Sequence, residues 1–466
     1  MKIKTLLTAI ATFLLFYTTS AQEITGYWEG RIGVTKSDSL TIGIDVKTHG
    51  DSIVVELDSP DQFFVGQKTD DAVFDGVSLS FAVPSLGIRF SGDINAEGSV
   101  ITSVFTQHSK KFGLSLRKGA ERKSFIRPQT PNGPFGYKTE ELAFRDRKNR
   151  YTLISGTLTM PENPKALVVF ISGSGWQDRD EFSFGHRPFA VIADACSRAG
   201  IATFRYDDLP HAIFIKSTTF DFADAVQLVL DSLNRITELK HLKKGLLGHS
   251  EGSLVAFIAA AQNPDIDFTV HLGGVSLPIY DILTYQIRSL NSFDPSLTDE
   301  MLEKSVNISQ ELYKTVIKSK NTEDCKNALA DKWDKVTGKL TEDEKAEYKM
   351  TPDRKFQTIY SLSTPWYFTL FHIKPEAYIR KVSSPVLAIS GGKDLQVPAI
   401  ESQSKMRKHL KHNSSNKFVI MDGLNHFLQP CTSGTVDEYA VIETTISEDV
   451  LEEIVRWIGD TVSEIP

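Results

Sequence analysis

Residues 245–262 read GLLGHSEGSLVAFIAAAQ, and this stretch decides the fold. A short apolar strand pattern, Gly245–Leu247, runs into the motif G-x-S-x-G at 248–252, and an apolar helical pattern follows at Leu254–Gln262. Glycines on both sides of a serine permit a tight, strained turn that lifts the hydroxyl out at the C-terminal end of the strand. The next helix directs its positive N-terminal end at that hydroxyl. This context predicts that Ser250 is a nucleophile, with a plain turn of small residues as the alternative.

Strand and helix patterns alternate on both sides of this stretch, from about residue 137 onward. The continuous apolar run Ala166–Ser172 indicates a strand buried on both faces of a parallel sheet. Further strands are predicted at Ile201–Tyr206, Lys244–Leu247, Pro385–Ile389 and Lys417–Met421, and helices at Phe189–Ala199, Phe220–Leu233 and Ser447–Ile458. This order predicts a doubly wound α/β domain over residues 137–466. Polar residues from about 280 to 376 interrupt it, and we predict inserted helices there with N-caps at Thr298 and Thr341.

A serine hydroxyl needs a base, and the sequence offers one after a later strand. His426 and Asp394 each follow the end of a predicted parallel strand, at the sheet edge where such folds place their sites. We predict that His426 accepts the Ser250 proton and that Asp394 orients the imidazole. Asp422 is the competing acid, and His249 is predicted to be a packed or hydrogen-bonded neighbour of the serine.

The developing negative charge needs backbone donors. We predict one from the N–H of Glu251, directly after the nucleophile, and a second from the N–H of Ser174 in the glycine loop 172–176. An ordinary glycine turn is the alternative for that loop. The four charges at 178–181 are either a solvated face or a brace of Arg–carboxylate pairs.

The first 21 residues differ from the rest. Lys2 and Lys4 precede an apolar run, Leu6–Phe16, and small residues end at Ala21, which is the order of a secretory signal peptide cleaved after Ala21. We therefore expect export to the periplasm or beyond, without stable membrane insertion. An uncleaved anchor is the alternative, but the apolar run is short for a membrane span.

Residues 22–120 are predicted to form a small β-meander, or a partly closed barrel. Apolar residues alternate with polar ones along segments such as Leu40–Val46 and Val77–Val83. No catalytic cluster is visible, so a structural or substrate-shielding role is expected. A linker over 121–136 follows; three prolines lie within 127–134 and predict an extended tether.

Composition excludes several classes of protein. Lys and Arg number 52 and Asp and Glu 59, so the net charge of −7 leaves no electrostatic footprint for nucleic acid. Three cysteines are too few for a disulfide scaffold. The 11 histidines do not show metal-ligand spacing, and no dinucleotide or phosphate loop appears, so no metal and no cofactor are expected.

The chain resembles secreted bacterial α/β-hydrolases of the serine esterase and serine aminopeptidase type, with an accessory β-domain in front. The matching stretches are GSGWQDRDE (173–181), RYDD (205–208), GHSEGS (248–253), STPWYF (363–368), PVLAISGGKDLQV (385–397) and LNHFLQ (424–429), with RPQTP (127–131) and DSPDQ (58–62) for the tether and the β-domain. The resemblance supports a triad of Ser250, Asp394 and His426 and acyl hydrolysis without a metal. Two departures concern the mouth of the site: Asp208-Leu209-Pro210 replaces an arginine–glycine-rich turn, and Ser172 stands where many relatives carry histidine.

The first hypothesis for function is a carboxylesterase with an acyl-enzyme intermediate, whose helical cap shapes the pocket. Trp366, Tyr367 and Phe368 could line that pocket or pack in the core. The second hypothesis is a peptidase acting on short peptides, with cap acids such as Glu300, Glu303 and Asp324 holding a terminus. The third is an inactive binding protein, which an intact triad disfavours. The expected partner is a small ester or a short peptide, and the oligomeric state stays open.

Overall fold

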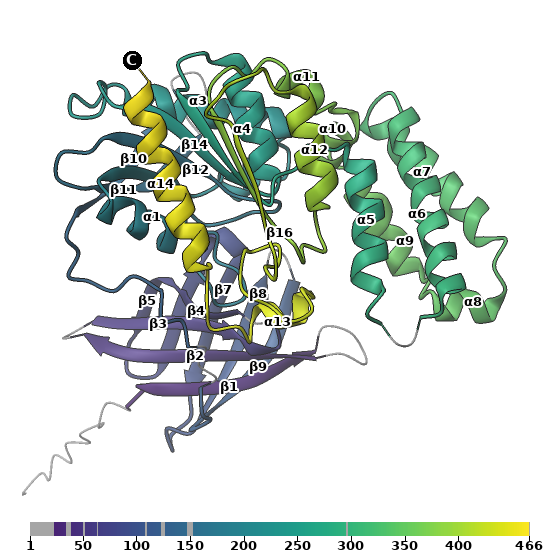
Figure 1. Cartoon of the computed structure of the whole chain (residues 1–466). Helices are drawn as coiled ribbons and strands as arrows, with labels where there is room; N and C mark the ends of the chain where they lie inside the picture. The colour runs from purple at the N-terminus through teal and green to yellow at the C-terminus, as the bar shows by residue number, and fades with distance from the viewer. Residues whose placement is uncertain are drawn as a thin grey trace, which may run out of the picture. The chain divides into compact units, whose positions relative to one another are not determined.

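The computed structural model describes residues 23–33, 39–49, 52–62, 64–107, 110–122, 126–146, 152–294 and 297–465 (Figure 1). The chain divides into two compact units, Met1–Lys123 and Ser124–Pro466, which we call the β-unit and the α/β-unit. The predicted signal segment, 1–21, lies outside the described residues.

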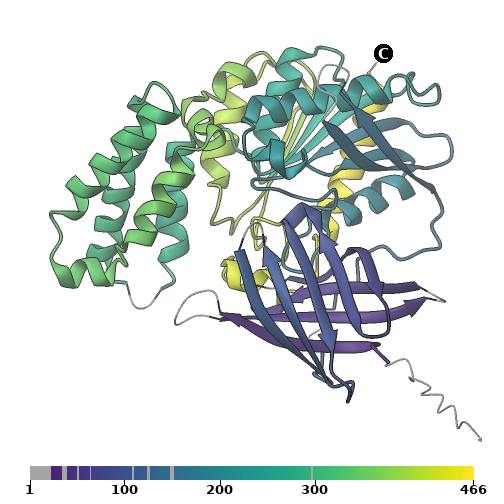
Figure 2. The same cartoon turned by 180° about the vertical axis from the view of Figure 1, so that it is seen from behind.

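The β-unit is one antiparallel sheet of nine described strands in the order β4-β3-β2-β1-β9-β8-β7-β6-β5. The strands are β1 (Gly26–Gly33), β2 (Ser39–His49), β3 (Ser52–Ser59), β4 (Phe64–Lys68), β5 (Asp70–Phe74), β6 (Ser78–Val83), β7 (Ile88–Ile94), β8 (Val100–Gln107) and β9 (Lys110–Lys118), with 3₁₀ turns η1 (Pro60–Gln62) and η2 (Pro84–Leu86). The edge strands β4 and β5 follow one another in the chain, and the sheet curls into a nearly closed barrel (Figure 2). The predicted all-β fold of this region is confirmed.

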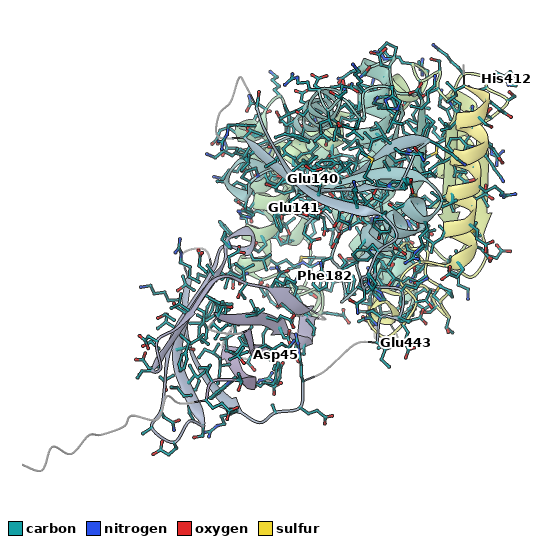
Figure 3. All side chains as sticks on the ribbon, turned by 90° about the vertical axis from the view of Figure 1, so that its left-hand side faces the viewer. Asp45, Glu140, Glu141, Phe182, His412 and Glu443 are labelled. Atoms are coloured by element: carbon teal, nitrogen blue, oxygen red, sulfur yellow. The ribbon has the colours of Figure 1, made fainter. Side chains whose placement is uncertain are left out.

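Alternation along the strands builds the core of the β-unit. Trp28, Ile44 and Leu116 are completely buried inside the barrel, as period two requires. Arg122, just after the last strand, donates to the Asp58 carboxylate at 2.8 Å from Nε and also pairs with Asp45. Asp45 is labelled in Figure 3. This arrangement ties the end of the unit to its second and third strands.

The α/β-unit is built on a sheet of eight described strands in the order β10-β11-β13-β12-β14-β15-β16-β17. The strands are β10 (Lys138–Arg145), β11 (Leu153–Met160), β12 (Ala166–Ile171), β13 (Ile201–Tyr206), β14 (Lys243–His249), β15 (Phe268–Leu272), β16 (Val386–Gly391) and β17 (Lys417–Met421). The six strands from β12 to β17 run parallel, and β10 and β11 add an antiparallel edge. The predicted parallel sheet is confirmed; β10, β11 and β15 had not been predicted.

Helices cover both faces of this sheet, each over its own apolar core (Figure 1). On one face lie α3 (Thr219–Leu233), α4 (Glu251–Gln262) and α12 (Ala399–His409). On the other lie α1 (Pro188–Arg198) and α14 (Glu448–Glu464). Strands covered on both sides must be apolar throughout, which is why β12 is buried at every position.

A helical cap is inserted between β15 and β16, and its helices stand beside the sheet in Figures 1 and 2. The insertion comprises α5 (Ile279–Asn291), α6 (Asp299–Lys318), α7 (Thr322–Thr337), α8 (Glu342–Glu347), α9 (Pro352–Leu362), α10 (Pro365–His372) and α11 (Glu376–Ile379); the short helices α2 (His211–Phe214) and α13 (Val436–Tyr439) lie elsewhere. Thr298 and Thr341 cap α6 and α8 through their side chains, as predicted.

The proline-rich segment before β10 is held against the α/β-unit, where an extended tether was expected. The Arg127 guanidinium donates to the carbonyls of Phe184, Ala440 and Ile442. The Gln129 side chain accepts from the N–H of Thr445 at 2.7 Å. Prolines exclude a helix here, but they leave side chains free to bind neighbouring carbonyls.

Candidate active site

Ser250 lies at a sharp turn between β14 and α4. Its φ of 52° and ψ of −119° are rarely adopted by a residue other than glycine, so the turn is strained. The Ser250 N–H donates to the Leu272 carbonyl at 2.9 Å, which anchors the turn to the next strand. A Cβ on Gly252 would come within 2.2 Å of the Ile171 carbonyl oxygen, and one on Gly248 within 2.3 Å of the Gly252 oxygen. Both glycines are therefore required by close backbone approach.

The structure brings Asp394 and His426 together at the ends of β16 and β17. His426 Nδ1 lies 2.8 Å from Asp394 Oδ2, and both side chains are almost completely buried. Asp394 Oδ1 accepts the N–H groups of Gln396 and Val397, each at 2.8 Å. The carboxylate is therefore fixed on both oxygens, with one of them turned to the imidazole.

Ser250 and His426 line one cavity, and no hydrogen bond joins them among the described residues. Such contacts often tighten only when a substrate is bound. Asp422, the competing acid, lies beside the Gly392 turn, and it is Asp394 that contacts the imidazole.

The glycine loop after β12 is held by a buried pair that the sequence did not disclose. Glu181 Oε1 accepts the Gly173 N–H at 2.7 Å and lies 2.9 Å from His249 Nδ1. Ser174, the next residue in the loop, lines the cavity. In the described part of the chain, neither the Ser174 amide nor the Glu251 amide donates a hydrogen bond within the protein.

His249 fills the role of a hydrogen-bonded neighbour. Its Nε2 lies 3.2 Å from the His426 carbonyl oxygen, so it links the glycine loop to the loop that carries His426. Burial acts to lower the pKa of His249, but attraction to the Glu181 carboxylate outweighs burial and the pKa is raised. The Glu181 carboxylate thus favours the charged form of His249 beside the glycine loop.

The charged stretch 178–181 is a brace. Arg179 donates to Asp207 from Nε at 3.0 Å and also pairs with Glu141 of β10, labelled in Figure 3. Asp180 pairs with Arg205 and with Arg187. These pairs tie the loop to its neighbouring strands, as the second of the two predicted alternatives requires.

The two departures from the resembled pattern contact each other. The Ser172 hydroxyl donates to Asp208 Oδ1 at 3.1 Å, and the Gln177 N–H donates to Oδ2 at 2.8 Å. Burial, assisted by the nearby Glu251 and Glu181 carboxylates, raises the pKa of Asp208 to about 8. Asp208 therefore supports both ends of the glycine loop.

The cavity at the site has a volume of about 210 Å³. Its apolar lining comes from the sheet edge and the cap: Leu254, Val275, Leu277, Ile279, Ile282, Leu283, Trp366, Tyr367, Leu370, Ile373, Pro375, Val397 and Phe427. Its polar lining, apart from Ser250 and His426, includes Gln177, Gln286, Gln396, Glu181 and Glu251. No Lys or Arg of the described ranges faces it. Trp366 and Tyr367 reach the cavity, whereas Phe368 packs within the cap.

The cap acids considered for a peptide terminus lie elsewhere. Glu303 pairs with Arg288 on the surface, Asp324 accepts the Lys320 N–H at 2.9 Å, and Glu300 does not line the cavity. A second serine–histidine pair exists, with Ser253 Oγ 2.7 Å from His271 Nδ1, but both are completely buried away from the cavity. This pair is part of the packing under α4.

The described ranges contain neither a metal-binding cluster nor a membrane-spanning helix. No cluster of three or more His, Cys, Asp or Glu side chains there is arranged to hold a metal ion. Every helix there is too short or too polar to cross a bilayer.

Comparison with known proteins relates the chain to one esterase by sequence. No family model matches it. It is 22% identical over 320 residues to esterase EstD of Thermotoga maritima, covering 68% of each chain. Solved structures similar to it include the Pyrococcus furiosus esterase PF2001 (14% identity, TM-score 0.41, 73% of this chain and 100% of that one) and a proline iminopeptidase of Mycobacterium smegmatis (16%, 0.42, 70% and 99%). The chain has the α/β-hydrolase fold with a cap insertion, and by sequence it is similar to an esterase.

Proposed function

We propose that the protein is a carboxylesterase that cleaves small, uncharged esters through a Ser250–His426–Asp394 triad. The single observation that carries the proposal is the convergence of a strained serine turn and a carboxylate-bound histidine on one apolar cavity. The sequence relationship to an esterase supports the choice of ester bonds.

In the first step His426 takes the proton of Ser250 as Oγ attacks the ester carbonyl carbon. The carbonyl π electrons move to oxygen, which is stabilised by the N–H groups of Glu251 and Ser174. The intermediate then collapses, the alcohol leaves with the proton from His426, and an acyl-serine remains. Water, deprotonated by His426, repeats the sequence and releases the acid. Asp394 holds the imidazole and stabilises its charged form throughout.

The lining argues for an uncharged substrate. A substrate carboxylate or phosphate would need a cationic partner, and no Lys or Arg of the described residues lines the cavity. His249 lines it, but its Nδ1 is already bound to the Glu181 carboxylate. The two carboxylates that reach the cavity, Glu181 and Glu251, already accept several internal hydrogen bonds. Aliphatic side chains and Trp366 provide most of the remaining surface, which suits a short or medium acyl chain.

A peptidase is the second candidate, because the same triad cleaves amides. It needs a fixed charge for a peptide terminus, and Glu300, Glu303 and Asp324 do not line the cavity. We rank it below the esterase for that reason. An inactive binding protein ranks last because all three triad groups are present.

The test is a parallel panel of p-nitrophenyl esters, from acetate to octanoate, and aminoacyl p-nitroanilides. We expect ester hydrolysis at kcat/KM at least about a hundredfold above the anilides, and loss of at least about a thousandfold in kcat with Ser250→Ala. Preference for anilides would reverse the ranking of the first two candidates. Absence of both activities would contradict the enzyme proposal.

We also propose export through cleavage after Ala21, from the basic, apolar and small-residue order of residues 1–21. Expression of the full chain in a bacterium, followed by cell fractionation and N-terminal sequencing, tests it. The expected mature N-terminus is Gln22 in the exported fraction. A cytoplasmic product that keeps Met1 would contradict the proposal.

A further inference from the structure

The side chain of Glu251 has contacts that the catalytic scheme does not use. Its carboxylate is buried directly after the nucleophile and accepts three hydrogen bonds from three different segments. The Ser174 hydroxyl donates to Oε2 at 2.8 Å, and the Trp366 indole N–H donates to Oε1 at 2.7 Å. Thr219, at the start of α3, donates to Oε1 at 3.3 Å.

Two of these contacts involve the proposed oxyanion hole. Glu251 and Ser174 are the residues whose backbone amides are proposed to bind the oxyanion, and a side-chain hydrogen bond ties one to the other. A side-chain hydrogen bond thus links the two turns that carry these amides, in addition to the backbone of each turn. Donors held in place before the reaction stabilise a developing charge far better than donors that must reorganise.

The third contact reaches the cap. Trp366 lies on α10 and lines the cavity beside Leu370, so a bound acyl chain would contact its ring. Its indole N–H is spent on Glu251 and cannot serve the substrate. The cap wall, the nucleophile turn and the glycine loop thus meet at one carboxylate.

We infer that the Glu251 side chain is a positioning residue that sets the geometry of the oxyanion hole by bridging Ser174 and Trp366. The inference rests on the proposed serine-hydrolase function. It assigns to one residue two separate tasks: the backbone amide binds the oxyanion, and the carboxylate aligns the second donor. Burial raises the pKa of Glu251, and the hydrogen bonds from Trp366, Ser174 and Thr219 offset only part of that rise.

The inference is tested by variants that break the bridge and one that keeps it. Glu251→Ala removes the bridge, and Ser174→Ala removes only the hydroxyl while leaving the backbone amide. Glu251→Gln keeps it, because the amide oxygen can accept from Trp366 while the amide nitrogen donates to the Ser174 hydroxyl. Glu303→Gln, an exposed cap residue outside the cavity, is the matched control for loss of charge.

Each variant is assayed on p-nitrophenyl butyrate and with a trifluoromethyl ketone inhibitor. In the inhibited enzyme Ser250 Oγ bonds to the ketone carbon, the C=O π pair moves to oxygen, and the serine proton passes to His426, so binding reports on the oxyanion hole. We expect kcat to fall about 10- to 100-fold in Glu251→Ala and Ser174→Ala, with KM within about threefold and the inhibition constant raised by the same factor as kcat falls. Glu303→Gln should stay within about threefold of wild type in kcat, and Glu251→Gln should restore kcat at least about fivefold over Glu251→Ala.

Three results would overturn the inference. The first is a kcat within twofold of wild type in Ser174→Ala, and the second is a loss of kcat/KM that comes from a higher KM with kcat unchanged. The third is a kcat in Glu251→Gln as low as that in Glu251→Ala. Thermal melting and circular dichroism check that each variant is folded. Should Glu251→Ala not fold, Ser174→Ala carries the test, since it removes a single oxygen. Failure of the proposed function is a separate outcome, because it would show as an inactive wild type.

Discussion

The carboxyl groups around the glycine loop differ in their hydrogen-bond partners, and these partners determine the role of each group. Asp394 accepts from two amides and contacts His426, so it is fixed as the partner of the proposed base. Glu181 balances His249 and holds the Gly173 amide. Asp208 and Glu251 accept mainly from neutral donors, and burial raises the pKa of both. Burial thus disfavours the charged form of both groups.

Asp208→Asn is expected to stabilise the protein at alkaline pH. The pKa of Asp208 rises from 3.8 to about 8 on folding, so the native state binds more protons between these values, and stability is lost as pH rises through that window. Asparagine can accept from Gln177 and donate to Ser172 without any proton loss. Urea unfolding gives the unfolding free energy of each protein at pH 5 and at pH 9. The difference, variant minus wild type, should be larger at pH 9 than at pH 5 by at least about 1 kcal/mol. If this difference in unfolding free energy stays constant or becomes smaller from pH 5 to pH 9, ionisation of Asp208 does not destabilise the folded protein, which would contradict the prediction.

At the scale of elements, the nucleophile turn is the feature that sequence predicted best, because its determinants are local. Two glycines, a serine and the flanking strand and helix patterns lie within 18 residues at 245–262. Asp394 and His426 were predicted because parallel strands end at one edge of the sheet. Strand β10 was missed because most of its residues are exposed, which leaves little alternation to detect. The Glu181–His249 contact spans 68 residues and has no local pattern.

Two glycine-to-alanine changes, one at the serine turn and one in a surface helix, are expected to have opposite effects on stability. A Cβ on Gly252 would lie 2.2 Å from the Ile171 carbonyl oxygen, so Gly252→Ala must displace the strand or the turn. We expect a loss of at least about 2 kcal/mol in unfolding free energy, together with loss of activity. Gly459 lies within α14 with open space at the Cβ position, so Gly459→Ala should gain about 0.5–1 kcal/mol. Chemical denaturation of both variants measures this, and a Gly252→Ala protein as stable as wild type would contradict the close approach.

At the scale of the whole molecule, the chain has two units, each with its own apolar core. The core of the β-unit includes Ile44, and that of the α/β-unit includes Ile258. The cap was predicted as an insertion that shapes the pocket, but the sequence left open which of Trp366, Tyr367 and Phe368 line it and which pack in the core. Trp366 and Tyr367 reach the cavity only because α10 is positioned by the rest of the cap. Side-chain direction in an inserted helix depends on tertiary packing, which composition and periodicity do not encode.

Separate cores predict separate responses to core truncation. Ile44→Ala and Ile258→Ala each remove a completely buried side chain and should each cost about 2–5 kcal/mol in their own unit. Scanning calorimetry of the full chain should resolve two transitions, with Ile44→Ala lowering one and Ile258→Ala lowering the other. A single transition that both variants shift equally would show that the units unfold as one.

The central claim, that Ser250 is the nucleophile, is tested most directly by mapping the site of fluorophosphonate labelling in the intact protein by mass spectrometry. Ser253 is an internal control, since it is bonded to the buried His271 but lies away from the cavity. We expect one fluorophosphonate adduct per chain, located on Ser250. This adduct should be absent in Ser250→Ala and unchanged in Ser253→Ala. An adduct on Ser253 or another residue, or esterase activity that survives in Ser250→Ala, would contradict it.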